Sequence, residues 1–260
     1  MEQIGWELFS FLVMLAFVCE FIDASIGMGY GTILSPVLLI LGFSPMVAIP
    51  AILITQAIGG LMAAIFHHRF HNVDFKRDSQ DLAAVYIISG LGIIATILAV
   101  IVAVNIPKQY VKGYIGILVI IMGIIVLINR PFRFTKWKLT LIGFLSAFNK
   151  GMSEGGFGPV VTGGQILAGY DQKAAVGVTT LSEVPICICG SITYFVMKKM
   201  IGMPEIYSQW QLLVALTLGV IIVAPIAAQV TRLLKKEKIH LILGIVMLVL
   251  GSWTLIKVFY

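Results

Sequence analysis

The chain has 260 residues, of which 59% are hydrophobic, and its charged residues are only 18 Lys and Arg and 12 Asp and Glu. Soluble proteins carry roughly twice that charged fraction, about 25%, and the mean hydropathy here is +1.02. So few charged side chains cannot cover the surface of a soluble globule of this size, which argues against a cytosolic enzyme, a disordered chain and a nucleic-acid binder. The composition predicts an all-α polytopic membrane protein.

Apolar stretches that are long enough to cross a bilayer define the predicted elements. A spanning helix needs about 20 apolar residues. Two regions are apolar but broken near their middle by glycines, and the halves of the second are too short to cross, so both are predicted as re-entrant hairpins. In chain order, the predicted membrane segments, about eight by length, are a hairpin at 6–41, spans at 46–66, 82–104 and 113–128, a hairpin at 137–168, and spans at 173–196, 211–230 and 239–258.

The basic residues predict the sidedness of this layout, because Lys and Arg accumulate in cytoplasmic loops. If each hairpin enters and leaves on one side, the larger set of basic residues shares one face. That set is Arg69, Lys76, Arg77, Arg130, Arg133, Lys136, Lys138, Lys173, Arg232, Lys235, Lys236 and Lys238, and the opposite set is Lys108, Lys112, Lys198, Lys199 and Lys257. The larger set marks the predicted cytoplasmic face of the cell membrane, with both termini outside. Two full spans in place of the second hairpin would divide the charges in the same way, so this distribution does not decide between them.

The chain is also predicted to be an internal duplication with an offset of 127 residues, which places Gly29–Gly31 on Gly156–Gly158. Each repeat, 1–130 and 131–260, would hold one hairpin and three spans within a single transmembrane domain. Because three crossings is an odd number, the second repeat would be inverted relative to the first. Inverted repeats with glycine-broken segments at matching positions are typical of secondary transporters, whose substrate site lies at mid-membrane between the repeats.

The glycine-broken regions carry two sequence motifs. The first reads DASIGMGYGTILSP over Asp23–Pro36 and LGFSP over Leu41–Pro45; the second reads GGFGP over Gly155–Pro159 and LAGY over Leu167–Tyr170. Together with the chain length and the duplication, these motifs resemble the two signatures of the TauE/SafE family of membrane permeases, over nearly the whole chain. The resemblance implies a transporter of sulfite, sulfonates or related sulfur oxyanions that has no ATPase domain.

Helix ends at the two hairpin tips are predicted to form an anion site. If each tip sits near the bilayer centre, a second limb begins there, at about Gly29 and Gly156, with unpaired backbone N–H groups and a positive dipole end. Glycine lets an oxyanion approach such a backbone without a cation. The alternative is that these glycines serve only tight turns and close helix packing. The predicted substrate-binding residues are Ser25, Gly27, Gly29, Tyr30, Gly31, Thr32, Asn149, Lys150, Ser153, Gly155, Gly156, Phe157 and Gly158, with Ser35 and Thr162 as further polar side chains.

Ionisable residues at membrane depth are the second group of candidates, because each is costly unless it is paired or functional. Asp23 maps onto Lys150 in the repeat, so the two could hold the hairpin tips together as an ion pair. Alternatively, Lys150 could attract the anion while the negative charge of Asp23 weakens that attraction. Glu154 or Glu183 could take up a proton with the anion, because burial disfavours a charged carboxylate; Glu183 could equally only hydrogen-bond a neighbouring helix. Glu20 is expected to face a water-filled mouth. The predicted coupling and gating residues are Asp23, Gln56, Glu154 and Glu183.

Two other groups of side chains resemble ligands of metal or sulfur. His67, His68 and His71 lie at a predicted span end, where polar side chains commonly snorkel, so no metal is expected there. Cys187 and Cys189 could contact a soft sulfur atom in a substrate such as thiosulfate, although buried cysteine is more often a small hydrophobe. No nucleotide-binding loop, catalytic triad or metalloprotease motif occurs in the sequence, which predicts neither enzymatic activity nor a cofactor.

The sequence therefore predicts a secondary transporter that moves a small sulfur-containing oxyanion, such as sulfite, a sulfonate or thiosulfate, across the cell membrane by alternating access, with proton coupling as an option. Its expected partners are this anion and the lipid bilayer, not nucleic acid, and the oligomeric state is left open. The alternatives are a transporter or channel for another small anion, such as a carboxylate, and a membrane scaffold or enzyme subunit that carries no flux.

Overall fold

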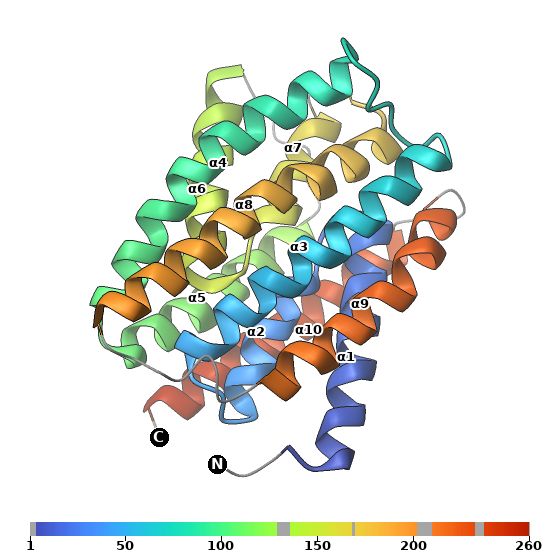
Figure 1. The fold of residues 1–260 in the computed structure, drawn as a ribbon. Helices are drawn as coiled ribbons and strands as arrows, with labels where there is room; N and C mark the ends of the chain where they lie inside the picture. Colours follow the sequence, from blue (N-terminus) through green and yellow to red (C-terminus); the bar gives the residue numbers. More distant parts are fainter. Residues whose placement is uncertain (1–3, 129–135, 168–169, 202–209, 232–236, 260) are drawn as a thin grey trace.

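A computed structural model describes residues 4–128, 136–167, 170–201, 210–231 and 237–259 of the chain. Every regular element within these ranges is a helix (Figure 1), so the predicted all-α class is confirmed. The helices are α1 (Trp6–Ile26), α2 (Tyr30–Ile40), α3 (Pro45–Arg69), α4 (Gln80–Asn105), α5 (Lys108–Ile128), α6 (Lys136–Ser153), α7 (Phe157–Leu167), α8 (Gln172–Ile201), α9 (Trp210–Val230) and α10 (Glu237–Phe259).

Each predicted span coincides with one of the long helices α3, α4, α5, α8, α9 and α10. By length and composition, the described helices that can cross a membrane are α1, α3, α4, α5, α8 and α9, and α10 contributes the shorter apolar stretch Ile245–Lys257. With 21 residues, α1 is therefore long enough to cross by itself, which the prediction of a hairpin limb did not anticipate. In contrast, α2 and α7 have 11 residues each and reach about half way at 1.5 Å per residue.

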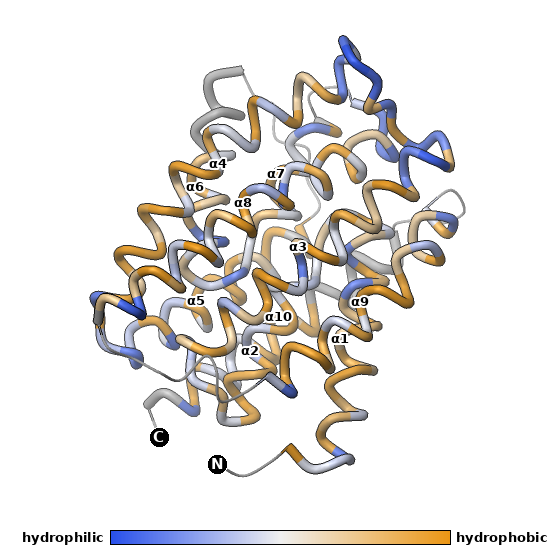
Figure 2. Tube along the Cα trace, in the orientation of Figure 1, coloured by the Kyte–Doolittle hydropathy of each residue, from blue (hydrophilic) through white to orange (hydrophobic). Residues whose placement is uncertain are grey.

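Large apolar side chains cover the outside of the bundle, and small ones line its helix contacts. On α4, Ile87 is 65% exposed and Ile94 is 55% exposed, whereas Ala95, Ala99 and Ala103 are fully buried. Apolar residues run along the helices, and hydrophilic ones gather in the loop between α3 and α4 (Figure 2). Isoleucine exposed along helices that are long enough to span a membrane is typical of a lipid-facing surface, and small residues allow helices to approach closely there. The described chain is thus a polytopic membrane protein.

The helix contacts bring the two halves of the chain together. Helix α1 packs against α9 and α6 against α4, while α3 packs against both α8 and α9, and α8 also packs against α4. The start of α1 and the end of α10 lie at one end of the bundle, and the α3–α4 loop lies at the other (Figure 1). The two short helices, α2 and α7, begin in the interior of this bundle. Their first turns position the candidate site.

Candidate functional site

The first interior turn joins α1 to α2 and depends on two glycines. Gly27 adopts a left-handed conformation with φ of 82°, and its N–H donates to the Asp23 carbonyl at 2.6 Å. Gly29 has φ of 136°, a value that strains any residue with a side chain. The Asp23 Oδ1 atom then accepts a hydrogen bond from the Tyr30 backbone N–H at 3.2 Å, which caps the new helix. Asp23 therefore supports the start of α2 as well as lying at membrane depth.

The second interior turn joins α6 to α7 in a similar way, but with a glutamate in it. Glu154 has a positive φ of 63°, which is uncommon for a residue with a side chain. The N–H of Glu154 donates to the Lys150 carbonyl at 2.7 Å. Gly156 follows with φ of 84°, and its N–H donates to Thr32 Oγ1 at 3.3 Å. The hydroxyl of Ser153 accepts from the Gly155 N–H at 3.2 Å.

The two turns pack directly against each other. A side-chain carbon placed on Gly31 would overlap the Glu154 carbonyl oxygen, and one placed on Gly158 would overlap the Gly27 carbonyl oxygen. Thr162 Oγ1 also donates to that Gly27 oxygen, at 2.9 Å. The packing role that was the alternative for these glycines is thus present at both positions. In this conformation the helix starts that were expected to hold an anion are covered by the opposite turn.

A buried polar cluster surrounds Lys150 beside these turns. The Lys150 Nζ donates to Gln56 Oε1 at 2.8 Å and to Glu154 Oε2 at 3.2 Å, and it lies 3.8 Å from Glu183 Oε1. The Gln56 Nε2 donates to Glu183 Oε2 at 2.7 Å and to Asp23 Oδ2 at 3.3 Å. These side chains come from α1, α3, α6 and α8 and from the second turn. All the predicted coupling and gating residues therefore meet in one cluster.

The pairing within this cluster differs from the expected contact between Asp23 and Lys150. These two residues, which the predicted repeat relates, meet through Gln56, while the ion-pair partners of Lys150 are Glu154 and Glu183. The ammonium group also lies 5.8 Å from the centre of the Phe157 ring. Lys150 is 1% exposed and Glu154 is 2% exposed, and Glu154 Oε1 has no hydrogen-bond partner. The cluster is thus a buried site in which the Glu154 carboxylate already contacts the Lys150 ammonium group.

Several predicted substrate-binding residues point away from the cluster. Asn149 receives a hydrogen bond from Tyr114 on α5, and Ser25 lies 3.4 Å from the Ala227 carbonyl on α9. The Tyr30 hydroxyl pairs with Thr55 at 2.7 Å, so only its backbone reaches Asp23. Adjacent helix positions are about 100° apart, and a residue next to Lys150 therefore faces another neighbour. These side chains hold the surrounding helices in place.

Of the two cysteines on α8, Cys187 lies beside the cluster and Cys189 does not. Cys187 is fully buried, and its thiol lies close enough to Lys150 to interact with it electrostatically. Cys189 is partly exposed. The spacing could have found this difference, because Cys187 follows Glu183 by four residues and shares its helix face. Any contact between a cysteine and a substrate at Lys150 would therefore involve Cys187.

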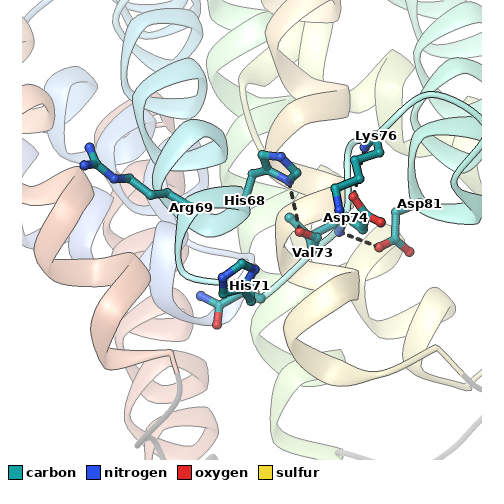
Figure 3. Close-up of a pocket in the computed structure, with 8 residues that line it drawn as sticks. His68, Arg69, His71, Val73, Asp74, Lys76 and Asp81 are labelled. Carbon is teal, nitrogen blue, oxygen red and sulfur yellow. Dashed lines mark hydrogen bonds between the residues drawn. The ribbon is translucent and has the colours of Figure 1, made fainter.

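The histidines at and just after the end of α3 lie in different environments. His67 is buried, with its Nε2 2.8 Å from the Ala24 carbonyl and its Nδ1 3.1 Å from Asn72 Nδ2. His68 and His71 instead line a surface pocket of about 440 Å³ in the α3–α4 loop, together with Arg69 (Figure 3). Among the described residues, no group of three or more His, Cys, Asp or Glu side chains is arranged to hold a metal ion. The i, i+4 histidine pair thus separates into an interior and a surface residue.

The bundle of long apolar helices, with a buried polar cluster at two broken helix pairs, has the features of a membrane transporter. Comparison with known proteins identifies the family. The family described as "Sulfite exporter TauE/SafE" matches residues 12–254, and the chain belongs to it. The chain is also similar to the "Probable membrane transporter protein YtnM" of Bacillus subtilis (strain 168), with 24% identity over 95% of this chain and 83% of that protein. No solved structure matches significantly.

Proposed function

We propose that the protein is a secondary transporter that moves a small sulfur oxyanion, such as sulfite, a sulfonate or thiosulfate, across the cell membrane by proton-coupled alternating access. The observation that carries this proposal is the Lys150 ammonium group, buried at the meeting point of the two broken helix pairs and contacted by Glu154. A buried cation that a mobile anion can reach is a site for that anion. The family description supports sulfur oxyanions as the substrate class.

The contact between Lys150 and Glu154 provides a route to proton coupling. The Glu154 carboxylate occupies a position on the ammonium group that an oxyanion would need. An arriving anion would displace that carboxylate, which would then lie in a buried site with no cation beside it. Such a charge costs several kcal/mol, so the displaced Glu154 takes up a proton from the side on which the anion enters. Glu154 would thus carry one proton across the membrane with each anion.

Reciprocal contacts support the proposal that the halves 1–130 and 131–260 are inverted repeats. Gln56 and Glu183 bond directly to each other and stand 127 residues apart. Gly31 packs on the Glu154 carbonyl and Gly158 on the Gly27 carbonyl, and the same offset converts one contact into the other. The helix pairs α1 with α9 and α6 with α4 are related in the same way. Alternating access then consists of separating the two turns toward one side and then toward the other.

The sidedness of the loops remains part of the proposal. The loop between α3 and α4 carries Arg69, Lys76 and Arg77 and lies at the end of the bundle opposite the start of α1 (Figure 1). Basic loops favour the cytoplasmic side. We therefore place this loop in the cytoplasm and the beginning of α1 outside.

Transport assays on the purified protein in lipid vesicles test this function. Uptake of labelled sulfite and thiosulfate is measured with and without an imposed pH gradient; thiosulfate is included because its charge does not change near neutral pH. The variant Lys150→Met removes the proposed anion ligand, and Lys199→Met makes the same change at an exposed position on α8. We expect uptake by the wild type and by Lys199→Met, and its loss in Lys150→Met.

Two results would contradict the proposal. Wild-type vesicles that take up neither anion would remove the substrate class, and uptake of a carboxylate in their place would identify another anion transporter. Equal uptake by Lys150→Met and the wild type would show that the anion does not bind at Lys150.

A further inference from the structure

Glu20 is a buried acidic residue that the mechanism above does not use. It lies in α1, one turn before Asp23, and is 1% exposed. The expectation that it faces a water-filled mouth is therefore wrong. A side-chain carbon on Gly59 would lie 2.9 Å from Glu20 Oε1 and also 2.9 Å from Val220 Cβ. The carboxyl group thus fills the space between α1, α3 and α9, where glycine in α3 makes room for it.

The surroundings of Glu20 do not compensate a negative charge. Its Oε2 atom has no hydrogen-bond partner. The ionisable groups around it are Cys19, Asp23, Tyr30, Glu183 and Lys150, of which only the last is cationic. Helix α9, which packs against Glu20, contains no ionisable residue, and those of α3 lie at its far end, His67 to Arg69.

Lys150 is already engaged by other groups. Its ammonium group donates to Gln56 and Glu154 and forms an ion pair with Glu183. No contact within bonding distance joins it to Glu20 in the described part of the chain. A carboxylate at this depth without a partner costs several kcal/mol, which favours the neutral, protonated form of the Glu20 carboxyl group.

Glu20 lies close enough to the Lys150 cluster to respond to the same movement of the first turn. Glu20 and Asp23 are three residues apart on α1 and therefore lie on the same face of the helix. Asp23 is bonded to the first turn through Tyr30 and to the Lys150 cluster through Gln56. A movement of the first turn, as alternating access requires, would change the surroundings of Asp23 and Glu20 together. Opening toward water would allow the Glu20 carboxyl group to lose its proton.

We propose that Glu20 is a second proton-binding site of the transport cycle, separate from the Lys150 cluster. This inference rests on the proposed function. The proton binds to a Glu20 carboxylate oxygen while α3 and α9 cover the site, as in the conformation described here. It exchanges with water on the side toward which the first turn opens. Coupling would then involve a proton at Glu20 in addition to the one that Glu154 exchanges.

Infrared spectroscopy of the purified protein tests the first half of this inference. A protonated carboxylic acid has a carbonyl stretching band that a carboxylate lacks. We expect Glu20→Gln to lose one such band at neutral pH. The matched control is Glu7→Gln, the same change at an exposed position on α1, which should keep every band. A Glu20→Gln spectrum with all the carboxylic acid bands of the wild type would overturn the proposal, whatever the substrate is.

Thiosulfate uptake into vesicles tests whether the proton moves. We expect Glu20→Gln to transport thiosulfate only down its own concentration gradient and to lose the uptake driven by a pH gradient, while Glu7→Gln retains both. Unchanged pH-driven uptake in Glu20→Gln would overturn the role of Glu20 in coupling. Absence of sulfite and thiosulfate flux in the wild type would count against the proposed function, and the infrared comparison would still decide whether Glu20 carries a proton.

Discussion

The contact between the two interior turns can be tested with one added methyl group. In Gly158→Ala the new carbon would lie 2.8 Å from Met28 Cα and 3.2 Å from the Gly27 carbonyl carbon, and would overlap the Gly27 oxygen. These are backbone atoms, so no flexible side chain can move aside. Carbon atoms in ordinary contact are about 3.5–4.0 Å apart, and the turns would therefore have to separate by roughly 1 Å. Gly163→Ala is the matched control, because it lies in the same helix and nothing lies within 4 Å of its added carbon.

Of the two alanine variants, only Gly158→Ala should lose stability. Overpacking of this kind costs about 1–3 kcal/mol, and the gain from replacing glycine by alanine in a helix offsets about 0.5–1 kcal/mol of it. One kcal/mol shifts the melting temperature by about 2–4 °C in a chain of this size. Gly158→Ala should therefore melt several degrees below the wild type. Gly163→Ala should melt at the same temperature or slightly above.

Thermal unfolding in one detergent, followed by intrinsic fluorescence, measures this difference. The same comparison with Gly31→Ala should also show a lower melting temperature, because its added carbon would overlap the Glu154 backbone. If Gly158→Ala and Gly31→Ala both melt at or above the wild type, the turns do not form the close contact described here.

Three further outcomes follow from the described contacts. Thr162→Val removes a hydrogen bond to the Gly27 carbonyl and should lower stability by about 1 kcal/mol in the same unfolding assay. His67→Ala should lower it by about 2–4 kcal/mol, because it leaves a cavity and removes the ring nitrogens that face Ala24 and Asn72, whereas exposed His71→Ala should have little effect. Incubation with EDTA should change neither the melting temperature nor anion uptake; a fall in either would indicate a metal site.

The meeting of the predicted coupling residues could be expected from the sequence, because the predicted duplication relates their positions. Residues that the predicted duplication relates, such as Gln56 and Glu183, would approach each other wherever two copies meet around an axis between them, and these two side chains bond directly. The same reasoning predicts that Asp23 lies near Lys150, but it does not predict that Gln56 lies between them. The actual partners depend on the side-chain rotamers and lengths of Gln56 and Glu154, which residue spacing does not specify.

The packing of the glycines and the burial of Glu20 could not be predicted from the sequence. A glycine at a helix start permits either an anion or another backbone to approach, and the choice depends on how the two turns are placed in space. Gly31 and Gly158 contact backbone in this conformation. The surroundings of Glu20 likewise depend on α9, whose contact with α1 joins residues about 200 positions apart. The full length of α1 was not predicted either, because its apolar residues continue as one helix as far as the glycine that ends it.

In the proposed mechanism, an oxyanion binds at Lys150 and displaces Glu154, which then takes up a proton. Calorimetric titration of the purified protein with thiosulfate, at one pH in two buffers of different ionisation heat, measures both the affinity and the protons taken up. We expect Glu154→Gln to take up about one proton fewer per bound anion than the wild type. Lys150→Met should bind about 10- to 100-fold more weakly, because it loses a charge-assisted interaction. Equal proton uptake by Glu154→Gln and the wild type, or unchanged affinity in Lys150→Met, would contradict the account.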